Sequence, residues 1–199
     1  MDRKSGIVIQ ICIALAGIVL FLPGLGGVRL FDWDEINFAE SAREMLITGD
    51  LLNVQINFES FWEKPPLFIW MQALCMKVFG VGEMAARLPN AIAGIVTLLV
   101  LFNIGRRCAG NRFGLLWVLM YAASFFPFFY FKSGIIDPWF NLFIFLGIYF
   151  FSRYADPQAR GRMMQNAALS ALFTGLGILT KGPVAFLIFI LTFGVWLIC

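Results

Sequence analysis

Four short polar motifs interrupt a sequence that is otherwise dominated by apolar residues. In chain order they are Asp32-Trp33-Asp34-Glu35, Glu63-Lys64-Pro65-Pro66, Asp137 within Ser133–Pro138, and Lys181-Gly182-Pro183. The two lysines suit a phosphate because an ammonium group is a compact point charge. A carboxylate such as Asp34 suits a general base, or a charge that stabilises positive charge on a reacting sugar. The motifs therefore predict a site that handles an anionic leaving group.

The rest of the composition narrows the chemistry. The sequence has no histidine, which excludes histidine-based catalysis and histidine-ligated zinc within this chain. It also has no P-loop and no GxGxxG motif. An activated phosphate donor would therefore have to be carried by the membrane. None of the four cysteines forms a CxxC pair, so we interpret them as small hydrophobic residues.

Each motif also has a purely structural explanation. Asp34 can cap the start of a helix. Glu63 and Lys64 can form a solvated pair before a helix that begins with two prolines. Asp137 can simply begin a helix, and Lys181 can reach the interface from a helix end. Ionisable residues at membrane depth are costly and usually functional, so four such motifs together favour a site.

The overall composition is that of an integral membrane protein. The chain of 199 residues is 60% hydrophobic and only 14% charged, with a mean hydropathy of +0.83. Soluble domains contain about 25% charged residues. The low charge content reflects long runs without charged residues, and these runs have about the length needed to cross the core of a bilayer. We therefore predict an all-α integral membrane protein, built as a multi-span helical bundle.

Six apolar runs are long enough, or nearly so, for tilted spanning helices. They are residues 6–26, 88–105, 113–131, 135–152, 164–180 and 183–199. We expect them to form one transmembrane domain over 1–199. The run 65–80 is short, begins with two prolines and contains Lys77, so it predicts a helix at the interface. Because the chain stops while still apolar, we expect it to be the N-terminal part of a longer protein.

The distribution of basic residues predicts the orientation. With the N-terminus inside, segments 1–5, 106–112 and 153–163 hold eight Lys or Arg residues and two acids. This obeys the positive-inside rule. A span at 65–80 would reverse everything that follows and turn the cluster around Arg106 outward. The six-span topology places all four polar motifs at the outer face, although the charge count did not use them.

The outer loop at 27–87 contains a second predicted surface helix. The periodic apolar positions are Phe38, Ala42, Met45 and Leu46, and the charged residues on other faces are Glu40, Arg43 and Glu44. This spacing predicts a short amphipathic helix over 37–48 that lies on the membrane surface beside the site. Asp34 or Asn37 is expected to cap its start, and Gly49 to end it.

Five stretches together resemble the polyprenyl-phosphate-sugar glycosyltransferases of the GT-C fold. Within that group the sequence is similar to the lipid A aminoarabinose transferases and the protein O-mannosyltransferase-like proteins. The stretches are Asp34–Asp50, Glu63–Leu67, Ala86-Arg87-Leu88-Pro89, Asp137 at the start of the fourth span, and Leu179–Pro183. They occur in the family's order and cover nearly the whole chain. Family members are much longer and usually carry a soluble outer domain.

The resemblance implies roles for seven residues. The catalytic residues would be Asp34 and Asp137, the donor-phosphate ligands Lys64 and Lys181, and further substrate contacts Glu35, Glu63 and Arg87. No cofactor is required by these residues, but some relatives bind a divalent cation, for which Glu63 is the candidate ligand. The implied partners are a polyprenyl-phosphate-linked sugar, a lipid or protein acceptor and membrane lipids, without nucleic acid.

These expectations describe a glycosyltransferase of the bacterial cytoplasmic membrane. It would move a sugar from a polyprenyl phosphate to a lipid or protein acceptor at the outer face. One alternative is a transporter, whose charges should line the midplane between broken helices, whereas here they cluster at one surface. Another is a truncated, non-catalytic fragment or accessory protein that retains the fold.

Overall fold

The computed structural model describes residues 3–31, 33–156 and 161–198, and it is built almost entirely from helices. The helices are α1 (Arg3–Phe21), α2 (Asp34–Thr48), α3 (Leu67–Phe79), α4 (Glu83–Ala122), α5 (Phe125–Phe131), α6 (Asp137–Ala155), α7 (Met163–Lys181) and α8 (Val184–Ile198). Two short strands are β1 (Gln55–Ile56) and β2 (Glu59–Ser60). The predicted all-α class is confirmed. Some residues used in the sequence analysis lie outside the described residues, namely Asp2, Asp32, Arg160 and Cys199.

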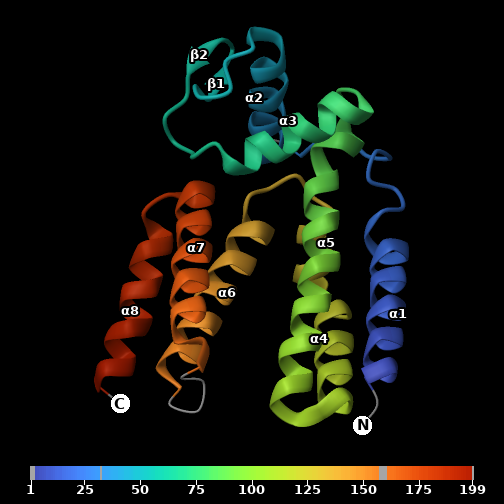
Figure 1. Ribbon diagram of the computed structural model, residues 1–199. Coiled ribbons are helices and arrows are strands. Elements are labelled where there is room, and N and C mark those ends of the chain that lie inside the picture. The colour runs from blue at the N-terminus through green and yellow to red at the C-terminus, as the bar shows by residue number, and fades with distance from the viewer. Residues whose placement is uncertain (1–2, 32, 157–160, 199) are drawn as a thin grey trace.

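The helices form two tiers (Figure 1). In the lower tier the bundle helices stand side by side, with α1 packed on α4 and α6 packed on α7. In the upper tier α3 lies across the end of the bundle, and α2 and the two strands lie above it. The loop between the first two bundle helices thus forms a cap over the bundle end where α6 begins and α7 finishes.

Two helices in the described part of the chain, α4 and α7, are long and apolar enough to cross a membrane. Helix α4 is broken at Ala109 and Gly110, where Gly110 has a φ of 87°. Beyond the break the second part of α4 packs closely against the first. A Cβ on Gly114 would lie only 2.8 Å from the carbonyl oxygen of Phe102, which shows how near the two backbones are. The two parts of α4 therefore need glycine where their backbones meet.

The second part of α4 ends earlier than the apolar run suggests. The sequence predicts one helix over 113–131, but α4 finishes at Ala122 and the chain continues as the separate helix α5. Ser124 between them has an extended backbone, with a ψ of 132°. Pro127 in the first turn of α5 cannot donate a backbone hydrogen bond to a preceding turn, which favours a new helix start there.

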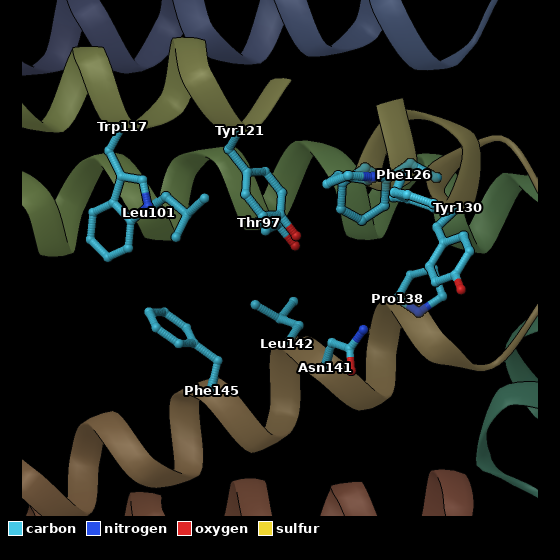
Figure 2. A pocket seen from close by; sticks show the side chains of 12 residues that line it. Thr97, Leu101, Trp117, Tyr121, Phe126, Tyr130, Pro138, Asn141, Leu142 and Phe145 are labelled. Carbon is cyan, nitrogen blue, oxygen red and sulfur yellow. The ribbon is translucent and has the colours of Figure 1, made fainter. Parts of the chain in front are cut away.

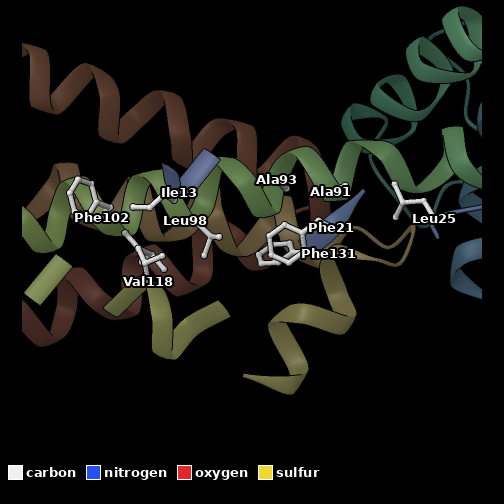
Figure 3. Packing of buried hydrophobic residues seen from close by; sticks show 10 residues of the cluster. Ile13, Phe21, Leu25, Ala91, Ala93, Leu98, Phe102, Val118 and Phe131 are labelled. Carbon is white, nitrogen blue, oxygen red and sulfur yellow. The ribbon is translucent and has the colours of Figure 1, made fainter. Parts of the chain in front are cut away.

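The main core lies where α1 packs against α4 and α5 (Figure 3). Phe21 of α1 and Phe131 of α5 meet edge to face, with ring centroids 5.1 Å apart. Both rings press on Gly94, where a Cβ would lie 2.8 Å from each of them. Phe102 is also fully buried in this cluster. Packing of aromatic rings against a glycine thus fixes α1 beside α4.

The predicted surface helix at 37–48 is α2, which begins three residues earlier. Of its four periodic apolar residues, Phe38, Ala42 and Met45 are buried inside the protein and Leu46 is half-buried, so the apolar face packs on the protein itself. Gly49 ends the helix in the left-handed conformation, with a φ of 74°, also as predicted. The predicted N-cap is wrong, because Trp33 occupies that position without a side-chain cap and Asp34 is already helical. The position of α2 on a membrane surface stays a prediction.

A two-stranded hairpin that the sequence pattern did not predict joins α2 to α3. Strand β1 pairs antiparallel with β2. The turn residues Asn57 and Phe58 both have positive φ, 57° and 61°, which is the geometry of a type I′ turn. The backbone N–H of Phe58 donates to the carboxylate of Glu44 at 2.9 Å. Glu44 is therefore fully buried under the hairpin, not on the exposed face that its spacing suggested.

Helix α3 corresponds to the predicted interfacial helix at 65–80. It begins directly after Pro66 and ends before Gly80, whose φ is 86°. Gln72 is fully buried and donates to the carbonyl oxygen of Ala86 at 2.8 Å, which ties α3 to the start of α4. The helix is therefore part of the protein's packed cap, whereas its position at a membrane interface stays a prediction.

Candidate functional site

One small apolar cluster holds three segments of the candidate site together. Phe38, Phe68 and Ile136 are buried against one another, and the rings of Phe38 and Phe68 meet edge to face with centroids 6.0 Å apart. The predicted site residues Asp34 and Lys64 stand four positions before Phe38 and Phe68, and Asp137 directly follows Ile136. The cluster therefore brings the starts of α2, α3 and α6 to the same end of the bundle.

A buried ion pair joins α2 to α4. Glu35 and Arg87 are only 1% and 3% exposed. Arg87 donates from Nε to one carboxylate oxygen of Glu35 and from Nη2 to the other, both at 2.8 Å. Such a two-pronged contact is among the stronger hydrogen-bonded ion pairs. Because both charges are out of solvent, each depends on the other for compensation.

The ion pair of Glu35 and Arg87 also binds the segment after α1 and the turn before α6 through hydrogen bonds. Arg87 also donates to three carbonyl oxygens of the segment after α1, those of Leu25, Val28 and Arg29. Glu35 accepts hydrogen bonds from the backbone N–H groups of Phe31, at 2.6 Å, and of Gly134 in the turn before α6. Neither side chain lines the candidate cavity described below. We therefore interpret the predicted substrate residues Glu35 and Arg87 as positioning residues.

A second ion pair joins the start of α6 to the end of α7. The Nζ of Lys181 donates to Oδ1 of Asp137 at 2.6 Å and lies 5.3 Å from the centre of the Phe140 ring. Each charge stands at the helix end whose dipole it complements. The side chains are 32% and 27% exposed. This pair can therefore be reached from outside, unlike the pair of Glu35 and Arg87.

A cavity of about 700 Å³ brings the two predicted phosphate-binding lysines together. It is lined by Asp50, Leu52, Asn53, Val54, Phe61, Trp62, Glu63, Lys64, Pro65, Pro66, Lys181, Gly182 and Pro183. Its walls are the segment after α2, the approach to α3 and the turn between α7 and α8. Gly182 allows that turn with a φ of 80°. Within the described residues Lys64 has no ion-pair partner, so its charge is free to meet an anion.

Asp34 does not stand in this cavity. It is the first residue of α2 and is exposed, but it is not among the lining residues. The expectation that all four site residues surround one cavity is therefore not met for Asp34, and Asp137 reaches the cavity only through Lys181. The reason is that the neighbouring Glu35 anchors the start of α2 to α4 and to the turn before α6, whereas the cavity lies against the turn between α7 and α8.

The carboxylates in the cavity lining are Glu63 and Asp50. Glu63 is exposed. Asp50 uses Oδ1 to accept hydrogen bonds from the backbone N–H groups of Leu52 and Asn53, at 3.0 and 3.2 Å. In the part of the chain that the structure describes, no group of three or more His, Cys, Asp or Glu residues could hold a metal ion. A divalent cation at Glu63 stays a prediction.

Two residues of the lining were missed as site candidates. Asp50 follows Gly49, whose left-handed backbone turns the chain from α2 back toward the approach to α3. Trp62 stands directly before the Glu63-Lys64 motif and is 88% exposed. A Trp beside a charged motif in the sequence could have indicated a binding site, because Trp is enriched at binding and membrane interfaces.

Two groups in the cap with a shifted pKa, Glu40 and Cys75, lie away from the cavity. A side-chain hydrogen bond from Arg43 lowers the pKa of Glu40. Burial raises the pKa of the Cys75 thiol. Neither titrating residue lines the cavity. Cys75 carries no disulfide, in line with its interpretation as a small hydrophobic residue.

A second cavity, of about 430 Å³, lies between α4, α5 and α6 (Figure 2). Its walls are largely apolar and include Trp117, Leu142 and Phe145, with polar atoms from Tyr121 and Asn141. None of the residues predicted to do chemistry lines it. The candidate site is therefore the cavity at the bundle end and not this one.

The fold is that of a known solved structure. ArnT from Cupriavidus metallidurans in the apo state matches with a TM-score of 0.81 and 25% identity, over 92% of this chain and 34% of that one. The same protein bound to undecaprenyl phosphate matches with a TM-score of 0.78 and 26% identity, over 93% of this chain and 34% of that one. The chain thus has the fold of the GT-C membrane glycosyltransferases and matches about a third of the length of that structure.

Residues 63–199 match the family model described as dolichyl-phosphate-mannose-protein mannosyltransferase, and the chain belongs to that family. An undecaprenyl phosphate-alpha-4-amino-4-deoxy-L-arabinose arabinosyl transferase of Edwardsiella ictaluri is 29% identical over 188 residues, which are 94% of this chain and 34% of that protein. An uncharacterised protein of Aquifex aeolicus is 30% identical over 191 residues, covering 94% and 41%. The chain spans about a third of the length of most curated relatives it matches.

Proposed function

We propose that the full-length protein moves a sugar from a polyprenyl phosphate to a lipid or protein acceptor. The observation that carries this proposal is the cavity in which Lys64 and Lys181 lie together. Two ammonium groups in one partly open cavity suit a phosphate ester. Its apolar lining, which includes Phe61 and Trp62, suits the lipid to which that phosphate is attached.

The names of the similar proteins agree on one part of the donor. The family description contains dolichyl phosphate, and the relatives' names contain undecaprenyl phosphate. Both are polyprenyl phosphates, whereas the sugars named are mannose and aminodeoxyarabinose. The proposal for this protein therefore extends to the lipid phosphate that they share and leaves the sugar open.

The proposed step is a displacement at the sugar carbon that carries the phosphate. The acceptor oxygen bonds to that carbon while its bond to the phosphate oxygen breaks, and the electron pair leaves with the phosphate. Lys64 and Lys181 stabilise the added negative charge, and Asp137 holds Lys181 in place through their hydrogen bond. Asp34 lies outside the lining of the lysine cavity, so we propose that the sugar and the acceptor extend from the cavity to the start of α2, where a hydroxyl acceptor gives its proton to Asp34. A phosphate acceptor is already ionised, and Asp34 then orients it or stabilises positive charge at the sugar carbon.

We further propose that the site faces the outer side of a bacterial cytoplasmic membrane, which the chain crosses six times. The candidate cavity and the arginine-rich segments lie at opposite ends of α6 and α7. The positive-inside rule assigns the arginine-rich end to the cytoplasm. In this arrangement α2 and α3 cover the outer end of the bundle.

The proposed function predicts a sugar-modified product in cells that contain the full-length gene. We expect mass spectrometry of extracted glycolipids and membrane glycoproteins to find one sugar-bearing species that disappears when the gene is deleted. Re-expression of the intact gene should restore it, and re-expression with Asp34→Asn should not. Identical glycolipid and glycoprotein profiles with and without the gene would contradict the proposed transferase activity.

A further inference from the structure

A basic pocket lies at the end of the bundle opposite the candidate site. It has a volume of about 320 Å³ and is lined by Arg107, Tyr149, Phe150, Arg153, Gly161, Arg162 and Asn166. Arg153 stands sixteen residues after Asp137 on α6, which at 1.5 Å per residue is about 24 Å along the helix. The pocket is therefore separate from the candidate cavity by most of the thickness of a bilayer core.

Among the described residues that line the pocket there are three guanidinium groups and no carboxylate. They come from different elements, since Arg107 belongs to α4, Arg153 to the last turn of α6 and Arg162 to the position before α7. Arg107 donates to the hydroxyl of Tyr149 at 3.3 Å, which orients both groups at the wall. Arg153 has one acidic neighbour, Asp156, at 3.0 Å, but that residue is not in the lining. The wall is therefore complementary to an anion.

An apolar groove continues from this pocket along the bundle. It has a volume of about 230 Å³ and is lined by Val96, Leu99, Val100, Asn103, Ile104, Arg107, Leu146, Tyr149 and Phe150. Three residues, Arg107, Tyr149 and Phe150, line both the pocket and the groove. A ligand that fills both spaces needs an anionic head and an apolar chain, joined at the level of Arg107.

We propose that this pocket and groove bind one anionic phospholipid of the leaflet at the arginine-rich end. The phosphate of the headgroup lies among Arg107, Arg153 and Arg162, and one acyl chain follows the groove between α4 and α6. Basic pockets between membrane helices on the cytoplasmic side commonly hold anionic headgroups in this manner. The groove distinguishes a lipid from a free phosphate, because a free ion would leave the apolar part unfilled.

The test is a titration of the delipidated full-length protein in a non-ionic detergent, read by native mass spectrometry. Phosphatidylglycerol is compared with phosphatidylcholine and with inorganic phosphate. We expect phosphatidylglycerol to bind at least tenfold more tightly than phosphatidylcholine, and millimolar phosphate not to displace it. Arg162→Gln should weaken phosphatidylglycerol about tenfold, as expected for loss of a charge-assisted contact.

Arg112→Gln is the matched control, because Arg112 is an exposed arginine at the same end that does not line the pocket. It should leave the affinity for phosphatidylglycerol unchanged. Equal weakening by both substitutions would overturn the proposal, as would equal binding of the two lipids by the unaltered protein. Displacement of the lipid by inorganic phosphate would also overturn it and would make the pocket a simple anion site. The lipid comparison needs no variant, and none of these outcomes depends on transferase activity.

Discussion

Asp34→Asn in the full-length protein is expected to lower the rate of sugar transfer by roughly 100-fold or more, as for loss of a positioned acid–base group. The amide keeps the shape of the side chain and removes its charge, so it can neither accept a proton nor stabilise positive charge. Asp34 is exposed, and within the described residues its side chain makes no hydrogen bond or ion pair, so protein abundance should change little. Transfer is measured in membranes with matched amounts of each protein.

Glu40→Gln is the control for this prediction. Glu40 belongs to the same helix, and its carboxylate is already paired with Arg43, so it is not free to take a proton from an acceptor. Its neutralisation should leave transfer close to that of the unaltered protein. If Asp34→Asn retained a near-normal rate, or if both substitutions lowered the rate equally, Asp34 would have no specific role in the reaction.

Arg87→Met is expected to destabilise the protein by about 3–5 kcal/mol, the cost of removing one partner from a buried ion pair. The substitution leaves the carboxylate of Glu35 buried without its counter-charge. It also removes the donor from three carbonyl oxygens in the segment after α1. The cap should therefore detach from the bundle end, and thermal unfolding of the purified protein should begin at a clearly lower temperature.

Arg43→Met makes the same chemical change in an ion pair on the surface of α2. The pair of Arg43 and Glu40 is about one-third exposed, and such pairs contribute little to stability. The melting temperature of this variant should match that of the unaltered protein. Similar melting temperatures for Arg87→Met and Arg43→Met would show that the buried pair does not hold the cap.

Local patterns were sufficient to predict most helices. Long apolar runs predicted the bundle helices, and the 3.6-residue spacing predicted the buried face of α2. The end of α2 at Gly49 followed from the ability of glycine to adopt a positive φ. These features depend on residues that are close in the sequence, so a pattern is enough to find them.

Contacts between distant segments could not be predicted in the same way. Asp137 and Lys181 are 44 positions apart, and Glu35 and Arg87 are 52 apart. Sequence motifs identified all four residues, but only the packing of the helices decides that one pair is reachable and the other buried. The separation of Asp34 from the cavity has the same origin, because it depends on where Glu35 is anchored.

The hairpin and the start of α5 were missed for local reasons. The turn at Asn57 and Phe58 lacks the Asn-Gly signal of a typical type I′ turn, so its positive φ values could not be anticipated. The run 113–131 is apolar throughout, and hydropathy alone does not mark the interruption at Ser124. In both cases backbone geometry departs from what composition indicates.

The most direct test of the proposed donor site is the binding of undecaprenyl phosphate to the purified full-length protein. We predict that Lys64→Ala raises the dissociation constant about tenfold or more, because a hydrogen bond to a charged group contributes about 1.5–3 kcal/mol. Lys77→Ala serves as the control, since Lys77 is exposed on α3 and does not line the cavity. It should leave the dissociation constant unchanged. Equal binding by the Lys64→Ala variant and the unaltered protein would contradict the assignment of this cavity to the lipid phosphate.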